Sequence, residues 1–147
     1  MKLSTKSRYA LRIILQIALD NISGQPLSQG RKIAEKQNIT EPYLEQIMIP
    51  LKRGGIVGTI RGCNGGYELL KPLREISVLE IIELFEGRIV LADCNPGGKN
   101  KCRQISICPT VSVWEELSAT FREKAASITL DTVIERYRRE VEPEYVI

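Results

Sequence analysis

The chain has 147 residues, of which 43% are hydrophobic and 27% charged, with 21 Lys and Arg against 18 Asp and Glu. This length suits one compact domain with an added helical arm, and it can bury a core without disulfide staples. The chain has four cysteines and no histidine, which excludes mixed Cys and His zinc sites and Cys-His catalysis. We expect a cytoplasmic protein, because the longest apolar run, Ile13 to Leu19, is far shorter than a membrane span.

The charge is unevenly distributed along the chain. Residues 1–76 carry 12 Lys and Arg against 6 Asp and Glu, whereas residues 77–147 carry 9 against 12. A basic first half followed by an acidic second half is typical of a nucleic-acid reader joined to an assembly or sensing region. An ordinary solvated surface can show the same imbalance, so the charge needs the support of motifs.

The first half of the chain begins with two predicted helices. Ser4 and Thr5 can cap the first helix, which runs to about Asp20 with apolar residues at helical spacing. The segment from Gly24 to Pro26 breaks this pattern. A short second helix is expected from about Gln29 to Lys36, followed by a turn.

The third predicted helix covers Glu41 to Arg53, with Thr40 as its cap and Gly54 after its end. Its apolar stripe faces inward and leaves polar residues outside. Two helices joined by a short turn, the second with polar groups in its first turns, are the parts of a helix-turn-helix reader. Pro50 lies inside this helix and has no amide proton, so we expect a kink or an early loosening there.

Two β-prone segments follow, Ile56 to Arg61 and Tyr67 to Leu70, on either side of the glycine-rich turn Gly62 to Gly66. This pattern predicts a hairpin, and a hairpin directly after a recognition helix is a wing. Arg61 at its tip can enter a minor groove. A phosphate-binding nucleotide loop is the alternative for these glycines, but such a loop has to open a helix, and none is predicted here.

The candidate DNA-contacting residues come from the third helix and the wing. A side-chain amide such as that of Gln46 can read a base edge, and Lys52 and Arg53 can contact phosphates. Exposed residues without a DNA role are the alternative for Tyr43 and Gln46, but the first turns of a recognition helix favour contact. The full set is Thr40, Tyr43, Glu45, Gln46, Lys52, Arg53, Arg61 and Asn64.

The second half opens with a predicted helix from Ser77, its cap, through Glu86. A loop-like stretch then contains three cysteines, Cys94, Cys102 and Cys108. Thiolates at this spacing can converge on a metal centre. The candidates are an iron–sulfur cluster, a Cys-rich site completed from elsewhere, and a thiol redox switch. Zinc is a weaker candidate because it needs a fourth ligand, and a vestigial site that binds nothing is the remaining alternative.

A long helix is predicted from Thr110, its cap, to about Ser127, and a last helix from Leu130 to about Glu140. Apolar side chains recur on the long helix at spacings of three and four and predict a stripe that pairs with another helix. These dimerisation residues are Val113, Trp114, Leu117 and Phe121. Packing of the stripe within its own chain is the alternative.

Several motifs occur in a characteristic order: Met1-Lys-Leu-Ser-Thr-Lys-Ser-Arg-Tyr-Ala10, Tyr43-Leu-Glu-Gln46, Arg61-Gly-Cys-Asn-Gly-Gly-Tyr67, and the downstream cysteine trio. Together they resemble the winged helix-turn-helix transcriptional regulators of the IscR, NsrR and CymR type, often called the Rrf-two family. The resemblance runs from Met1 to about Val133 and is closest to the branch that binds iron–sulfur clusters.

The resemblance implies a mostly α fold with a small β-hairpin wing and a long C-terminal dimerisation helix. It implies a homodimer that binds a two-fold symmetric site on double-stranded DNA, with the third helix in the major groove and the wing at the minor groove. It also implies that Cys94, Cys102 and Cys108 bind an iron–sulfur cluster. The expected organisation is a DNA-binding domain in residues 1–87, a cluster-binding loop in residues 88–109, and dimerisation and C-terminal helices in residues 110–147.

The chain departs from the family pattern at the cluster. Seven residues, Asn95 to Lys101, separate the first two cysteines, where the familiar branches have five. Val111 stands where the iron–sulfur regulator has a histidine ligand, and Arg8 where the nitric-oxide sensor has an aspartate ligand. The fourth ligand and the choice between a 2Fe-2S and a 4Fe-4S cluster therefore stay open. The fourth position could be open to solvent or taken by a small thiol or a carboxylate, such as Asp93, Glu115 or Glu116.

The sequence predicts a DNA-binding transcriptional regulator whose operator binding responds to iron–sulfur status, iron, oxygen or nitric oxide. One alternative is a cluster-free repressor of the same fold that acts through thiol redox chemistry or a partner protein. A thiol oxidoreductase is disfavoured because the chain has no Cys-x-x-Cys motif. Cys63 fits the wing turn as a small residue, with redox tuning of DNA contact as its alternative role.

Overall fold

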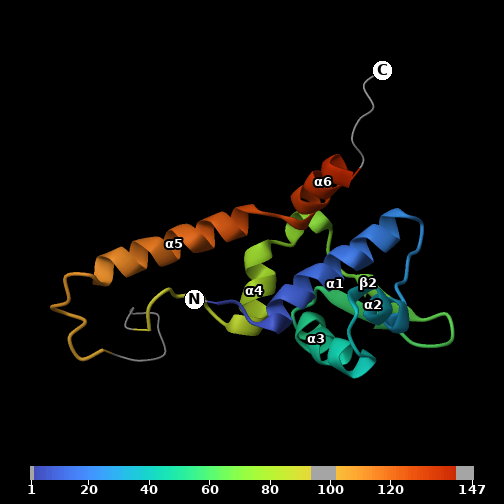
Figure 1. Ribbon diagram of the computed structural model, residues 1–147, viewed down its shortest axis with the longest axis horizontal. Coiled ribbons are helices and arrows are strands. Elements are labelled where there is room, and N and C mark those ends of the chain that lie inside the picture. Colours follow the sequence, from blue (N-terminus) through green and yellow to red (C-terminus); the bar gives the residue numbers. More distant parts are fainter. Residues whose placement is uncertain (1, 94–101, 142–147) are drawn as a thin grey trace, which may run out of the picture.

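The computed structural model describes residues 2–93 and 102–141. A winged helix-turn-helix domain occupies one end of the molecule, and a long helix projects from it (Figure 1). The elements are, in chain order, α1 (Thr5–Ile22), α2 (Gly30–Gln37), α3 (Glu41–Arg53), β1 (Val57–Ile60), β2 (Gly66–Leu69), the short 3-10 helix η1 (Leu73–Glu75), α4 (Val78–Glu86), α5 (Val111–Ser127) and α6 (Leu130–Val141). The mostly α fold with a hairpin wing that the sequence predicts is confirmed.

Three of the predicted helix caps are confirmed. The Ser4 hydroxyl accepts from the Ser7 amide at 3.2 Å, that of Thr40 from the Tyr43 amide at 3.3 Å, and that of Ser77 from the Glu80 amide at 3.1 Å. Each bond satisfies an amide proton that has no partner inside its helix. These caps fix the starting points of α1, α3 and α4.

The core forms around α1, which α2, α3, β2, α4 and α6 all contact. Its largest fully buried side chains are Ile13, Ile14, Ile17, Ile33, Leu44, Ile47, Met48, Leu51, Ile56, Ile76, Ile81 and Leu130. Each contributes about 1.5–3 kcal/mol of apolar burial. Leu130 belongs to α6, so the C-terminal helix is part of the same core as the helix-turn-helix.

Helix α3 continues through Pro50 to Arg53. Of the two outcomes expected at Pro50, the early loosening is therefore wrong, and a kink stays a prediction. A proline removes one hydrogen bond, but Met48 and Leu51 are fully buried on the inner face and hold the last turn in place. The Gly54 amide donates to the Pro50 carbonyl at 2.9 Å, which closes the helix end.

The wing is an antiparallel pair in which Val57 lies opposite Leu69 and Ile60 opposite Gly66. A third segment joins it just before α2. The Ser28 amide donates to the Tyr67 carbonyl at 3.0 Å, and the Tyr67 amide donates to the Ser28 carbonyl at 2.9 Å. This pair of bonds, the Ser28–Tyr67 bridge, attaches the wing to the start of the helix-turn-helix.

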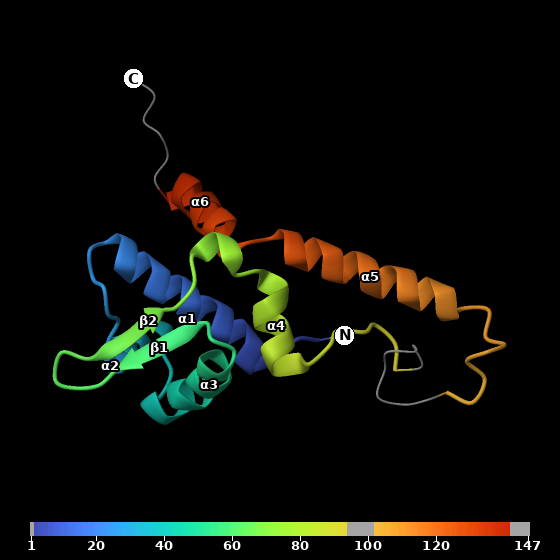
Figure 2. The ribbon, with the colours of Figure 1, turned by 180° about the vertical axis from the view of Figure 1, so that it is seen from behind.

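The segment between α5 and α6 pairs with the segment just before α4. The Val78 amide donates to the Ile128 carbonyl at 2.8 Å, and the Leu130 amide donates to the Ile76 carbonyl at 3.0 Å. The C-terminal part of α5 lies beside α4, whereas its N-terminal end points away from the domain (Figures 1 and 2). In the part of the chain that the structure describes, no helix combines the length and apolar character needed to cross a bilayer.

Candidate nucleic-acid interface

The outer face of α3 carries a row of exposed side chains opposite its buried stripe. Glu45 and Gln46 lie in its first half, and Lys52 and Arg53 in its last turn, and all four are exposed. The helix follows α2 through Asn38, whose φ of 54° and ψ of 49° are left-handed. Asparagine tolerates this conformation better than most residues, and it gives the tight turn between the two helices.

Thr40 and Tyr43, two of the predicted DNA contacts, also have structural roles. The Thr40 hydroxyl is engaged as the helix cap. The half-buried Tyr43 ring meets the Tyr9 ring edge to face, with centroids 5.9 Å apart and planes at 89°. Such pairs stabilise by about 0.5–1.5 kcal/mol beyond simple burial. Their contact with DNA stays a prediction.

Ile49 was not among the predicted contacts, yet it lies on the same outer face. Its side chain is 45% exposed, and it is three residues after Gln46 and four before Arg53. Helical spacing from these two residues is the signal that could have identified it. An exposed apolar side chain at this point can contact the methyl group of thymine.

The wing tip presents Arg61, Cys63 and Asn64, all exposed. The turn depends on its glycines. Gly62 has a φ of +118°, and a β-carbon at Gly65 would lie 2.1 Å from the Ile60 carbonyl oxygen. In both ribbon views the wing loop lies at the end of the domain opposite the projecting end of α5 (Figures 1 and 2).

Tyr67 connects the wing to both helices of the helix-turn-helix. A β-carbon at Gly30, the first residue of α2, would lie 3.2 Å from the Tyr67 ring, so the strand packs closely on that helix. Burial raises the pKa of the Tyr67 phenol, and the negative charge of Glu45 on α3 raises it further. The wing and the recognition helix are therefore close enough to influence each other electrostatically.

The sequence comparisons agree with this geometry. Residues 3–136 match the Rrf2 family, described as iron-dependent transcriptional regulator. The chain belongs to the Rrf2 family. It is 39% identical over 122 residues to the HTH-type transcriptional regulator IscR of Cereibacter sphaeroides, covering 81% of this chain and 77% of that protein.

Solved structures show the same Rrf2 architecture. IscR of T. potens superposes with a TM-score of 0.74 at 31% identity, covering 97% of this chain and 91% of that one. CymR of B. subtilis, described as the global cysteine regulator, gives a TM-score of 0.74 at 29% identity, with coverage of 92% and 98%. The protein is a DNA-binding transcriptional regulator of this type.

The cysteine segment is described only in part in this Rrf2 protein. Cys94, the first of the three predicted ligands, lies outside the described residues, and so do residues 95–101. Cys102 and Cys108 are half-buried and in the free thiol form. Within residues 2–93 and 102–141, no three Cys, Asp or Glu side chains are grouped to hold a metal ion. That finding does not test the trio, because Cys94 is not among them.

Cys108 lies directly before α5, in a setting that favours its thiolate. Its sulfur is 3.3 Å from the Thr110 hydroxyl. The hydrogen bond from this hydroxyl lowers the pKa of the Cys108 thiol, and the backbone amides of Thr110 and Val111 lower it further. Thr110 is the residue directly before α5, as predicted, but its side chain makes no capping bond to the helix. The hydroxyl faces Cys108 instead.

The carboxylates predicted as possible fourth ligands belong to no group that could hold a metal ion within residues 2–93 and 102–141. Asp93, Glu115 and Glu116 are all exposed. Arg8, at the position of the aspartate ligand in the nitric-oxide sensor, donates to the Thr5 hydroxyl at 3.3 Å on the surface of α1. The role of Asp93, Glu115 or Glu116 as the fourth ligand stays a prediction.

The predicted dimerisation stripe on α5 is only partly covered by its own chain. Val113 is 47% and Leu117 is 45% exposed, while Trp114 and Phe121 are half-buried. Trp114 and Phe121 recur at helical spacing with Ser118 and Ala125, which are buried against the domain, whereas Val113 and Leu117 lie beside this face. The Ser118 hydroxyl accepts from the Leu91 amide at 3.0 Å. The exposed stripe is thus available at the projecting end of the helix.

Proposed function

We propose that this regulator binds a two-fold symmetric operator as a homodimer, and that an iron–sulfur cluster on Cys94, Cys102 and Cys108 controls that binding. The observation that carries the DNA-binding part is the exposed polar and basic face of α3, attached to the wing by the Ser28–Tyr67 bridge. Relatives of this chain are named HTH-type transcriptional regulators, so we expect action on chromosomal DNA in the cytoplasm, without an enzymatic reaction.

In this proposal α3 contacts the major groove and the phosphates, and the wing contacts the minor groove. Gln46 can donate to and accept from the two edge atoms of adenine in the major groove, and Ile49 can contact a thymine methyl beside it. Lys52 and Arg53 would contact phosphates. Arg61 would enter the minor groove. The remaining proposed contacts are Thr40, Tyr43 and Glu45 at the start and in the first half of α3, and Asn64 in the wing turn.

The dimer would form through α5. One recognition helix reads only a half-site, so a two-fold operator requires two subunits. The exposure of Val113 and Leu117, with Trp114 and Phe121 half-buried beside them, supports pairing with the same helix of a second copy. Such a pairing would set the distance between the two α3 helices to about one turn of DNA.

The described donors suit a cluster chemically. Iron–sulfur clusters are held by thiolates, and the environment of Cys108 lowers the pKa of its thiol. Bound iron would supply a centre that reacts with oxygen or nitric oxide or is lost when iron is scarce. The cysteine segment joins α4 to α5, so a change in this segment can alter the position of the dimerisation helix relative to the DNA-binding domain.

The cluster-free alternative has support of its own. CymR, a neighbour of equal TM-score, is described as a cysteine regulator, and a related structure of Staphylococcus aureus CymR is described as an oxidized form. A thiol switch at Cys102 or Cys108 would need the lowered pKa that Cys108 has. Both hypotheses predict that the cysteines matter, but only one predicts iron.

Anaerobic purification followed by optical spectroscopy and iron and sulfide analysis separates the two hypotheses. We expect a coloured protein whose charge-transfer absorption is lost in each single alanine variant of Cys94, Cys102 and Cys108. Cys63→Ala on the wing serves as the matched control and should keep the colour. A colourless protein that cannot be reconstituted with iron and sulfide, but whose operator affinity changes on thiol oxidation, would favour the cluster-free repressor.

Gel filtration and operator binding test the dimer and the DNA site. We expect a dimer at micromolar concentration, and Leu117→Glu should shift it toward monomer because a carboxylate would enter the apolar interface. The same variant should weaken binding to a two-half-site operator more than to a single half-site. A monomeric wild-type protein that retards no promoter fragment, including its own, would contradict the proposal.

A further inference from the structure

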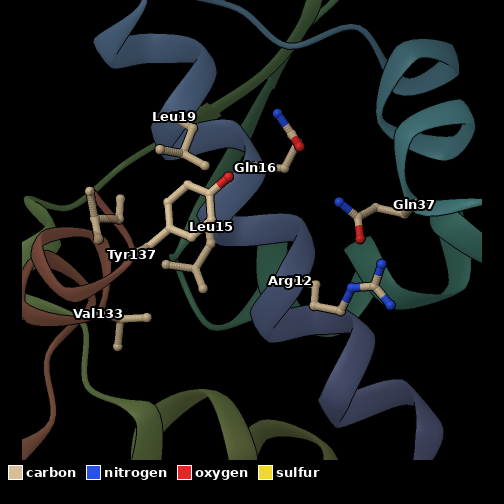
Figure 3. Close-up of a pocket in the computed structure, with 8 residues that line it drawn as sticks. Arg12, Leu15, Gln16, Leu19, Gln37, Val133 and Tyr137 are labelled. Atoms are coloured by element: carbon tan, nitrogen blue, oxygen red, sulfur yellow. The ribbon is translucent and has the colours of Figure 1, made fainter. Parts of the chain in front are cut away.

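A cavity of about 380 Å³ lies between α1, the end of α2 and α6, away from the recognition face. Its volume is within the range of roughly 300–1,000 Å³ that small-molecule sites occupy. Figure 3 shows Arg12 and Gln37 on one side and Leu19, Val133 and Tyr137 on the other. None of the proposed DNA contacts and none of the cysteines that the structure describes lines this cavity.

Gln37 is the polar group that needs a ligand here. It is the last residue of α2 and only 7% exposed. Its side-chain oxygen is fully buried and accepts no hydrogen bond from the described residues. A buried acceptor without a donor is rare in native proteins and destabilises the fold. A bound N–H or O–H group in the cavity would satisfy it.

Arg12 supplies a positive charge next to Gln37. Its guanidinium lies over the Tyr9 ring, 5.2 Å from the centroid. In residues 2–93 and 102–141 no carboxylate forms an ion pair with it. A guanidinium that an aromatic ring holds in place, and whose paired N–H groups have no carboxylate partner, is well suited to bind a carboxylate with two parallel hydrogen bonds.

The opposite wall is apolar. Leu15 and Leu19 of α1 lie with Val133 and Tyr137 of α6 on the side away from Arg12 and Gln37 (Figure 3). Tyr137 is 48% exposed, so one side of the site is open for entry. A ligand that matches all three features has a carboxylate, a neighbouring hydrogen-bond donor and a short apolar body.

We propose that this cavity binds a small apolar α-amino acid. Its carboxylate would bind Arg12, its ammonium group would donate to Gln37, and its aliphatic side chain would lie against the leucines. Gln37 directly precedes Asn38, the turn residue that leads to α3. Occupancy of the site should therefore change operator affinity, a consequence that rests on the proposed DNA-binding function.

Calorimetric titration of the full-length protein with four matched probes tests the binding itself. L-leucine has all three groups, 4-methylpentanoate lacks the ammonium group, isoamylamine lacks the carboxylate, and glycine lacks the apolar body. We expect L-leucine to bind with a dissociation constant below about 1 mM and each truncated probe to bind at least about tenfold more weakly. No heat with any probe, or equal binding of all four, would overturn the proposal.

Variants assign the binding to this cavity. Arg12→Gln and Gln37→Leu should each weaken L-leucine binding by about tenfold or more. Arg136→Gln is the matched control, because it removes an exposed arginine of α6 that does not line the cavity. Unchanged binding in both cavity variants would refute the site. So would an Arg12→Gln protein whose only change is a shifted monomer–dimer equilibrium, because the face would then be a subunit contact.

Fluorescence anisotropy with a labelled operator tests the coupling separately. L-leucine should change operator affinity in the wild-type protein and leave Arg12→Gln unaffected. If calorimetry shows binding but operator affinity does not respond, the site stands and its regulatory role is wrong. If the protein binds no DNA at all, the calorimetric result still decides the site, and the proposed function fails independently.

Discussion

The Lys36 ammonium nitrogen lies 2.8 Å from the Asp20 carboxylate on the neighbouring helix α1. Two more donors reach the same carboxylate: the Gln16 amide at 2.8 Å and the Ser28 hydroxyl at 2.9 Å. Asp20 is only 8% exposed. One carboxylate therefore joins α1, α2 and the segment that carries the Ser28–Tyr67 bridge.

Replacing this carboxylate should destabilise the domain. In Asp20→Ala the buried Ser28 hydroxyl loses its acceptor, and Lys36 and Gln16 lose theirs, which should lower the free energy of unfolding by about 2–4 kcal/mol. Urea denaturation measures this. Glu35→Ala removes an exposed ion pair with Arg31 instead and should change stability by less than about 1 kcal/mol. Equal effects of the two substitutions would show that the Asp20 network is unimportant.

The free energy of unfolding should decrease as the pH is lowered, because two carboxylates, those of Asp20 and Glu86, become protonated. Burial alone would raise the pKa of Asp20, but its hydrogen bonds from Lys36, Ser28 and Gln16 outweigh burial and lower it below its ordinary 3.8. The hydrogen bonds from Ser4 and Ser7 lower the pKa of Glu86 below its ordinary 4.5. Each carboxylate stabilises the fold fully at a pH above its ordinary pKa. This stabilisation is lost as the pH falls through the lowered pKa of the folded protein.

Denaturation at a series of pH values tests this dependence. The unfolding free energy should be level between about pH 6 and pH 7.5, since the chain has no histidine, and should fall below about pH 4.5. Glu86→Gln should reduce the acid-side slope. A slope unchanged in both Glu86→Gln and Asp20→Asn would mean that other carboxylates cause the acid sensitivity.

The wing turn should tolerate no side chain at Gly65. A methyl group there would lie 2.1 Å from the Ile60 carbonyl oxygen, so Gly65→Ala must shift the backbone of the turn. We expect operator affinity to fall by at least about 1–2 kcal/mol, with the helical circular dichroism retained. Cys63→Ala, in the same turn and exposed, should bind as the wild type does.

Arg61→Ala should weaken operator binding by about 1–3 kcal/mol if its guanidinium enters a groove. Anisotropy titration on an operator duplex gives this number. Arg139→Ala on α6 removes the same charge far from the wing and controls for the general loss of basic character. An affinity that Arg61→Ala leaves within error of the wild type would show that the wing does not reach DNA.

Base-reading and phosphate-binding residues should be separable on α3. Gln46→Ala should relax the preference at one base pair of each half-site, because a side-chain amide can bond two edge atoms of adenine. Lys52→Ala should weaken all sequences alike and reduce the slope of log affinity against log salt by about one unit. Identical behaviour of both variants across operator sequences would contradict the assignment of this face.

Local signals predicted most of the helix-turn-helix and the wing. The caps at Ser4, Thr40 and Ser77 depend on residues three positions apart, and the wing turn depends on its glycines, so short stretches of sequence contain the necessary information. The Ser28–Tyr67 bridge and the Asp20 network join segments that meet only in the folded chain. Ile49 was recognisable by its spacing from Gln46 and Arg53, but the predicted contacts did not include it.

The candidate sites were predicted less completely, for physical reasons. Thr110 was expected to cap α5, since threonine before a helix usually does so, but a nearby thiol competes for its hydroxyl. The cavity beside Gln37 arises from α1 and α6, which are separated by most of the sequence. No periodicity in either helix indicates that their facing surfaces leave a space. The position of α3 after a short turn was predictable because a helix-turn-helix has its own local pattern; the contact of its outer face with DNA stays a prediction.

The Ser28–Tyr67 bridge also limits how the protein can adapt to its operator. Because two backbone hydrogen bonds hold the wing to the segment before α2, the wing cannot swing freely relative to α3. The distance between the proposed major-groove contact of α3 and the proposed minor-groove contact of the wing is then a fixed property of the protein, and any mismatch must be absorbed by bending or twisting the DNA. Operators should therefore differ in affinity according to the flexibility of base pairs that no side chain touches.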